Sequence, residues 1–210
     1  MKVNGKHYLT IWMEDGVIKM INQPRLPHHF EIVSFDKAQQ TADAITTMVV
    51  RGAGAIGAAG GYAMAQAVRE AVASEDYANK LIELRDIIAG TRPTAQNLFY
   101  AVDAVYQAVE SLRGKEAISK ADEVAKNIAE EDICDGEGIG KTGAGLISDG
   151  MRILTHCNAG WLAFVDWGSA LAPIYAASRQ GKKLWVWVDE TRPRLQGARL
   201  TSWELGNEQI

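Results

Sequence analysis

The stretch that decides the fold is MRILTHCNAG (151–160), where a short apolar run ends on polar residues and a glycine. Before it the apolar residues recur mostly at helical spacing, and after it strand-like and helix-like segments alternate. We interpret these as strand, helix, strand and helix, in the order MRILTHC (151–157), WGSALAPIYAASRQG (167–181), KKLWVWVD (182–189) and TSWELGNEQI (201–210). This order predicts an α/β protein with βαβ units and a parallel sheet.

Upstream of this stretch, the sequence predicts a small β-containing unit over 1–35 and a helical block over 36–148. The segments HYLTIW (7–12) and VIKMIN (17–22) flank a turn and indicate a hairpin. Helices are expected from Phe35 to Val49 behind a Ser34/Asp36 cap, over 55–73, 76–90 and 116–131, and from Pro93 as a first helical residue. The expected domains are therefore 1–148 and 149–210. Two strands are too few for a doubly wound sheet, so we expect the second domain to be incomplete.

Composition narrows the class of partner. The chain has 210 residues, is 47% hydrophobic and carries a net charge of −4, which disfavours a nucleic acid partner. No secretory leader and no run of eighteen apolar residues is visible, so a cytoplasmic protein without a membrane partner is expected. Cys134 and Cys157 lie in dissimilar contexts and predict no disulfide. The four histidines lack metal-ligand spacing, so neither a metal nor another cofactor is predicted.

Two glycine-containing segments are candidates for anion binding, and only the second fits it. DGEGIGKTG (135–143) imitates nucleotide-binding motifs but follows a helical, acidic segment, so we interpret it as a glycine-rich surface helix or connection that binds no nucleotide. VVRGAGAIG (49–57) is different, because a helix that starts on small residues lets backbone N–H groups approach an anion beside Arg51. Close helix packing explains the same glycines equally well. Arg92, just before Pro93, is either a second anion contact or a surface arginine.

The thiol of Cys157 has two readings. A buried cysteine is commonly inert packing, but one at the carboxyl end of a parallel strand faces the edge where α/β proteins bind ligands. Its neighbour His156 is expected to point to the opposite face. The second strand ends in an equally polar loop. There Asp189 and Glu190 are either an acid–base pair or helix caps, and Gln196 and Gly197 lie beside Arg194 and Arg199 in a candidate anion nest.

Four segments together resemble the methylthioribose-1-phosphate isomerase family, whose superfamily includes ribose-1,5-bisphosphate isomerases and regulatory subunits of initiation factor two-B. They are MVVRGAGAIGAAGGYAMA (48–65), TRPTAQNLFYAV (91–102), ILTHCNAG (153–160) and DETRPRLQGARLTSWEL (189–205). The resemblance implies a helical N-terminal domain, a Rossmann-like C-terminal domain and a sugar phosphate between them, without a cofactor. It implies an enzyme of methionine salvage that converts an aldose 1-phosphate to the ketose.

The resemblance also assigns residues. By matching motifs, Arg51, Gly52, Ala53, Arg92 and Gln196 would contact the substrate and Cys157 would be catalytic. The family's second catalytic group is an aspartate on the next strand, so the resemblance implies a remainder of the protein beyond these residues, and a homodimer. Gly54 stands where relatives often have proline, and Trp161, Phe164 and Trp167 replace a less aromatic stretch. This divergence leaves the substituent on sugar carbon five open, as methylthioribose or a 5-deoxyribose-like sugar.

Two other functions fit parts of the pattern. A non-catalytic subunit of the initiation factor two-B type keeps this fold and binds a sugar phosphate or nucleotide, although the intact THCNAG segment favours the enzyme. A cysteine hydrolase with Cys157 as nucleophile needs a histidine base, and His28 and His29 lie in the N-terminal unit.

Overall fold

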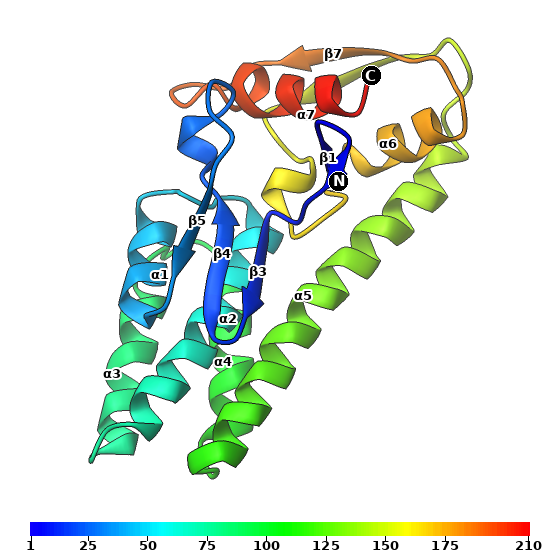
Figure 1. Cartoon of the computed structure of the whole chain (residues 1–210). Helices are drawn as coiled ribbons and strands as arrows, with labels where there is room; N and C mark the ends of the chain where they lie inside the picture. Colours follow the sequence, from blue (N-terminus) through cyan, green and yellow to red (C-terminus); the bar gives the residue numbers. More distant parts are fainter.

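A computed structural model describes all 210 residues as a mixed α/β protein with two regions (Figure 1). A three-stranded sheet and helices α1 to α5 form the first region. A two-stranded sheet with α6 and α7 forms the second, at the top of Figure 1. The long helix α5 runs from one region into the other and ends beside α6.

The first sheet is antiparallel and pairs β3 (Ile11–Glu14), β4 (Val17–Ile21) and β5 (Ile32–Phe35) in that order. Glu14 pairs with Val17, which confirms the predicted hairpin. The prediction of a helix from Phe35 was wrong, because residues 32–35 pair with β4 and α1 (Ala38–Thr46) starts three residues later. Two further short strands, β1 (Lys2–Val3) and β2 (Lys6–His7), pair with each other and were not predicted.

Helix α2 (Ala53–Val72) is the centre of the first region and is buried along most of its length. Its small residues let α3 (Tyr77–Ala89), α4 (Gln96–Val109) and α5 (Gly114–Ala144) approach it closely. For example, a Cβ at Gly60 would lie 2.6 Å from Leu98 Cδ1 in α4. The helix expected from Pro93 was placed too early, because α4 begins at Gln96 and Pro93 lies in the preceding turn.

The glycine-rich segment 135–143 belongs to α5, a single helix of 31 residues. It is therefore a helix rather than a loop, and the helix expected over 116–131 continues to Ala144. Gly136 and Gly140 are buried where α5 passes the segment around Trp167. These glycines provide close packing between the two regions.

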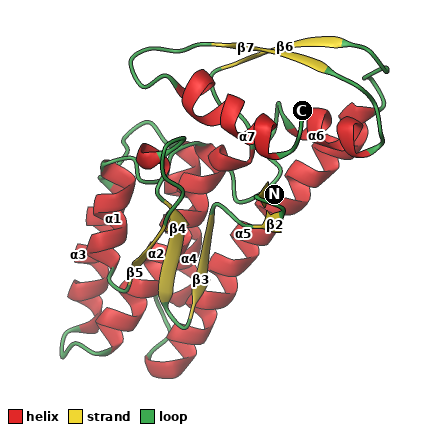
Figure 2. Ribbon diagram, turned by 45° about the horizontal axis from the view of Figure 1, so that its top comes forward, coloured by secondary structure: helices red, strands yellow, loops and turns green.

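The second region contains β6 (Arg152–His156) and β7 (Trp185–Asp189), which pair in parallel. Helices α6 (Ala172–Arg179) and α7 (Ser202–Asn207) cover one face of this sheet (Figure 2). This order confirms the predicted strand–helix–strand–helix pattern. The two strands are covered on one face only. The opposite face exposes Leu154, Trp185 and Trp187.

Two hydrophobic cores stabilise the chain. The first is built from β3, β4 and helices α1 to α5, and the second joins β6, β7, α6 and α7 to the N-terminal residues Met1, Val3, Ile21 and Leu26. The N-terminal segment thus packs on both regions, and it places Gln23 beside residues that follow β6. Across the chain, every helix is too short or too polar to span a lipid bilayer.

Two glycines of α5 provide a matched test of packing. A Cβ at Gly136 would lie 2.9 Å from Gly168 O, whereas one at Gly138 meets no atom within 4 Å. We expect Gly136→Ala to destabilise the fold by about 1–3 kcal/mol through overpacking. We expect Gly138→Ala to stabilise it by about 0.5–1 kcal/mol, because alanine favours a helix interior. Urea unfolding of both variants measures the difference, and equal effects would contradict the packing role of Gly136.

Candidate active site

Cys157 follows β6 directly and holds the chain in a sharp turn. Its φ of +59° lies in the left-handed region, which is unfavourable for a residue with a side chain. The N–H of Cys157 donates to the Asp189 carbonyl oxygen at 3.2 Å, and its carbonyl oxygen accepts from the Thr201 hydroxyl at 2.7 Å. Both β7 and the chain before α7 therefore hold this strained turn. Such strain concentrates at functional sites.

The N-terminus of α2 lies beside this turn. Gly52 precedes the helix with a φ of +91°, and a Cβ there would overlap Ala163, so this position requires glycine. Ala53 is the first residue of α2. The first N–H groups of a helix have no intrahelical partner and attract anions.

The side chain of Arg51 connects the two regions. Its Nη1 donates to Asn158 Oδ1, and its Nη2 donates to the Asn158 carbonyl oxygen at 3.1 Å. Burial lowers the pKa of Arg51, nearby Cys157 and Glu204 raise it, and the positive charge of Arg92 lowers it further. The guanidinium thus lies within electrostatic range of both Cys157 and Arg92. Its contact with Asn158 places it next to the thiol.

Arg92 lies in the turn before α4 rather than at a helix N-terminus, which corrects the expected location. Its Nη1 is buried and has no hydrogen-bond partner in the chain. A buried donor without a partner is costly, so Arg92 Nη1 is a candidate donor to an acceptor that the chain does not supply.

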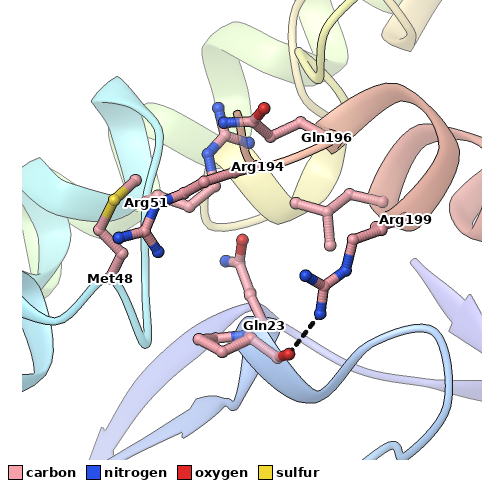
Figure 3. Close-up of a pocket in the computed structure, with 8 residues that line it drawn as sticks. Gln23, Met48, Arg51, Arg194, Gln196 and Arg199 are labelled. Atoms are coloured by element: carbon pink, nitrogen blue, oxygen red, sulfur yellow. Dashed lines mark hydrogen bonds between the residues drawn. The ribbon is translucent and has the colours of Figure 1, made fainter. Parts of the chain in front are cut away.

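A cavity of about 80 Å³ lies in front of Arg51 (Figure 3). Arg199 is held there by the carbonyl oxygens of Pro24 and Leu26, while Arg194 makes no hydrogen bond or ion pair with another residue. Three guanidinium groups without a facing carboxylate make this cavity strongly positive. The lining residues are Gln23, Pro24, Met48, Arg51, Arg194, Gln196, Arg199 and Leu200.

Of the residues predicted for the site, Arg51 and Gln196 line this cavity. Gly52 and Ala53 follow Arg51 in the chain, and Cys157 and Arg92 lie within electrostatic range of it, but none of these four lines the cavity. Gln196 accepts from the Thr191 hydroxyl at 2.8 Å. Sequence reasoning missed Gln23, whose Oε1 is buried without a partner. It also missed Met48, whose φ of +63° is unusual for this residue type. No periodicity or motif marks Gln23, and Met48 begins the segment 48–65 without having been assigned a role there.

The two carboxylates at the end of β7, Asp189 and Glu190, accept hydrogen bonds from nearby groups of the chain. Glu190 accepts from the N–H groups of Thr191, Gly197 and Ala198, which is the capping role considered above. Asp189 accepts from His156 Nδ1 at 3.0 Å on the exposed side, and this hydrogen bond lowers the pKa of Asp189. His156 therefore points away from Cys157, as expected. No three His, Cys, Asp or Glu side chains lie close enough together to hold a metal ion.

None of the aromatic residues after Cys157 lines the cavity. Trp161 is fully buried in the second core, and Trp167 packs against Gly136 and Gly140 of α5. Phe164 and Asp132 occupy the space beside Gly54, where a Cβ would collide with both. A larger hollow of about 440 Å³ lies between β3, α2 and α5. Both of its cations are paired there, Arg69 with Asp122 and Lys126 with Glu130.

Comparison with known proteins assigns the chain to a family. Residues 49–210 match the model of the initiation factor 2 subunit family (IF-2B). The chain belongs to this family. It is 44% identical to the methylthioribose-1-phosphate isomerase of Methylocella silvestris, over 100% of this chain and 59% of that protein. It therefore spans somewhat less than two thirds of the length of the curated relatives that it matches.

Two solved structures of the IF-2B family fold in the same way. The translation initiation factor eIF-2B subunit delta from A. fulgidus is 40% identical with a TM-score of 0.84, over 97% of this chain and 61% of that one. The 5-methylthioribose 1-phosphate isomerase from Pyrococcus horikoshii OT3 is 36% identical with a TM-score of 0.87, over 98% of this chain and 59% of that one. The two names describe different functions on one fold.

The half-buried carboxyl of Asp132 gives a pH-dependent prediction. Burial raises its pKa from 3.8 to about 6, although the Val165 N–H bond opposes this. Because the folded pKa is raised, ionisation of Asp132 destabilises the fold, and this cost grows as pH rises from about 4 to about 6. We expect Asp132→Asn to gain stability relative to the wild type over this range and to keep the gain at pH 7.5. Thermal unfolding across pH measures it, with exposed Asp103→Asn as a control that shows no such gain.

Proposed function

We propose that the protein carrying this chain is an aldose–ketose isomerase that converts methylthioribose 1-phosphate, or a similar pentose 1-phosphate, to the ribulose 1-phosphate. The observation that carries the proposal is the grouping of Arg51, Arg92 and Cys157 at the N-terminus of α2. This group combines an anion site with a titratable thiol. The names and identities of the relatives described above support the same reaction.

The arginines and the helix N-terminus would bind the phosphate group. Arg51 offers a guanidinium already oriented by Asn158, and Arg92 offers a buried donor without a partner. The N–H groups at Gly52 and Ala53 would add backbone donors. Gln196, which lines the same cavity, would contact the sugar. Together these contacts would keep the phosphate on carbon one while the ring opens.

Cys157 would act as an acid–base group on the sugar. In the reaction the bond between carbon one and the ring oxygen breaks, and the ring oxygen gains a proton. Hydrogen then leaves carbon two and arrives at carbon one, while the hydroxyl on carbon two becomes the ketone and releases its proton. Atoms and electrons balance without an oxidant. One positioned acid–base group contributes roughly 10²–10⁴-fold.

A second acid–base group on the opposite side of the sugar would complete this reaction. We propose that residues 149–210 begin a Rossmann-like domain and that another strand of this domain carries the second group, an aspartate. The exposed face of β6 and β7, with Leu154, Trp185 and Trp187, supports further structure against this sheet. We also propose a cytoplasmic homodimer that acts on a free sugar phosphate.

One observation favours a second candidate function. The A. fulgidus protein named as an initiation factor subunit is 40% identical to this chain. Under this alternative, the protein is a non-catalytic regulatory subunit that binds a sugar phosphate or nucleotide in the same cavity. Binding without turnover would support the subunit, and formation of the ketose would support the enzyme.

We expect Cys157→Ser, made in the protein at its natural length, to fold normally and to lose at least about 100-fold in turnover of methylthioribose 1-phosphate. Formation of the ketose measures turnover, and circular dichroism confirms folding. Cys134→Ser is the matched control, because Cys134 is exposed on α5, and it should keep wild-type activity. Activity of the Cys157 variant within threefold of the wild type would return this thiol to a packing role.

The anion site is tested separately by binding. We expect Arg51→Ala and Arg92→Ala each to weaken sugar phosphate binding by about 1.5–3 kcal/mol, the scale of a charged hydrogen bond. Arg85→Ala is the control, since Arg85 is on α3 and bonds to Asp86. Calorimetric titration gives the affinities. Unchanged affinity in both site variants would remove α2 and α4 from the binding site.

A further inference from the structure

A fully buried carboxylate lies behind the site and lines no part of the cavity. Glu204 in α7 is 0% exposed, and it has no ion-pair partner within 4 Å. Its Oε1 accepts from Asn158 Nδ2 at 2.8 Å and from the Leu162 N–H at 3.3 Å. Its Oε2 accepts from the Trp161 N–H at 3.0 Å and from the Tyr175 hydroxyl at 2.5 Å. Four donors from three segments thus converge on one side chain.

A buried charge without an ion partner is costly, so hydrogen bonds must stabilise it. Burial raises the pKa of Glu204 to about 7, while the bonds from Tyr175 and Asn158 and the charge of Arg51 lower it. The backbone also leaves space for this carboxylate. A Cβ at Gly160 would overlap Glu204 Oε2, so only glycine fits there.

The consequence for the site passes through Asn158. An ionised carboxylate can only accept hydrogen bonds, so the Asn158 amide must turn its NH₂ group toward Glu204. The same NH₂ group donates to the Thr201 hydroxyl at 3.0 Å. The amide oxygen is then left to face Arg51, whose Nη1 donates to it. Glu204 and Thr201 together therefore determine which atom of Asn158 the guanidinium meets.

We propose that Glu204 is a positioning residue, which directs Arg51 toward the substrate phosphate by fixing the Asn158 amide and the chain that follows Cys157. Glu204 itself does not touch the substrate. The inference rests on the proposed function for the roles of Arg51 and Cys157. It goes further by assigning a part in that reaction to a residue at the far end of the sequence.

The test is Glu204→Gln in the protein at its natural length. A glutamine has one acceptor oxygen for the four donors and adds an NH₂ group of its own, so Asn158 loses its charged acceptor and keeps only the Thr201 hydroxyl on that side. We expect the dissociation constant for inorganic phosphate and the KM for methylthioribose 1-phosphate to rise about tenfold, as for one lost charged hydrogen bond. We expect kcat to change less than KM. A dissociation constant within twofold of the wild type would overturn the proposal.

Two controls separate positioning from stability. Tyr175→Phe removes a donor to Glu204 but leaves the Asn158 contact, and Glu208→Gln changes a carboxylate near the end of α7 that bonds to Arg179 and Lys2. Both are expected to lower the melting temperature and to keep phosphate affinity. If Tyr175→Phe weakened phosphate binding as much as Glu204→Gln, the role of Glu204 would be structural and the proposal wrong.

Two further measurements keep the test decisive. If Glu204→Gln does not fold, adding Asn158→Asp exchanges donor and acceptor between the two positions, and recovered folding is expected. Failure of this pair to fold would contradict the assigned contact. If the wild type neither binds phosphate nor forms the ketose, the proposed function fails. Crystal structures of wild type and variant then still show whether Arg51 keeps or loses Asn158, and a retained contact overturns the positioning role.

Discussion

The contact between Arg51 and Asn158 is the interaction on which the site depends, because it joins the two regions of the chain where their functional groups meet. Arg51 comes from the segment before α2, and Asn158 comes from the turn after β6. Arg51 is followed by Gly52, which precedes α2 in the first region. Asn158 donates to Thr201 and Glu204 in the second region. This contact places the N-terminus of α2 and the turn that carries the thiol side by side.

Close backbone approach makes that contact possible. Gly52 lies against Ala163, and Gly160 lies against both Glu204 and Gly168. At each of these places a single methyl group would push the segments apart. The positive φ of Cys157 and Met48 shows that the chain also accepts backbone strain here. The site is therefore stabilised by the surrounding packing more than by local preference, as is common for functional sites.

The sequence predicted the parts of this arrangement that local chemistry determines. The end of β6 just before Cys157, the hairpin of β3 and β4, and the alternation of strand and helix after residue 150 followed from apolar patterns. The strand β5 was missed because its pairing with β4 is a contact across a loop, which local patterns do not show. The start of α4 was misplaced because Pro93 fits a first helical turn as well as the loop that contains it.

The contacts of Glu204 could not be predicted from the sequence, for a related reason. The segment TSWELGNEQI was predicted only as a helix, and the folded chain brings its Glu204 to Asn158, 46 residues earlier. Gln23 is similar, since its contact with the Leu162 carbonyl oxygen spans 139 residues. Long-range polar contacts of this kind leave no periodic trace. The cavity lined by Gln23, Arg51 and Gln196 therefore becomes visible only in the folded chain.

The single helix α5 has a mechanical consequence. Its 31 residues make a rod of about 45 Å, with Ala117 to Ala129 in the first core and Ala144 in the second. A rod packed into both cores holds the two regions at a fixed separation. Any change in how the regions face each other would therefore require α5 to bend or its packing near Trp167 and α6 to break.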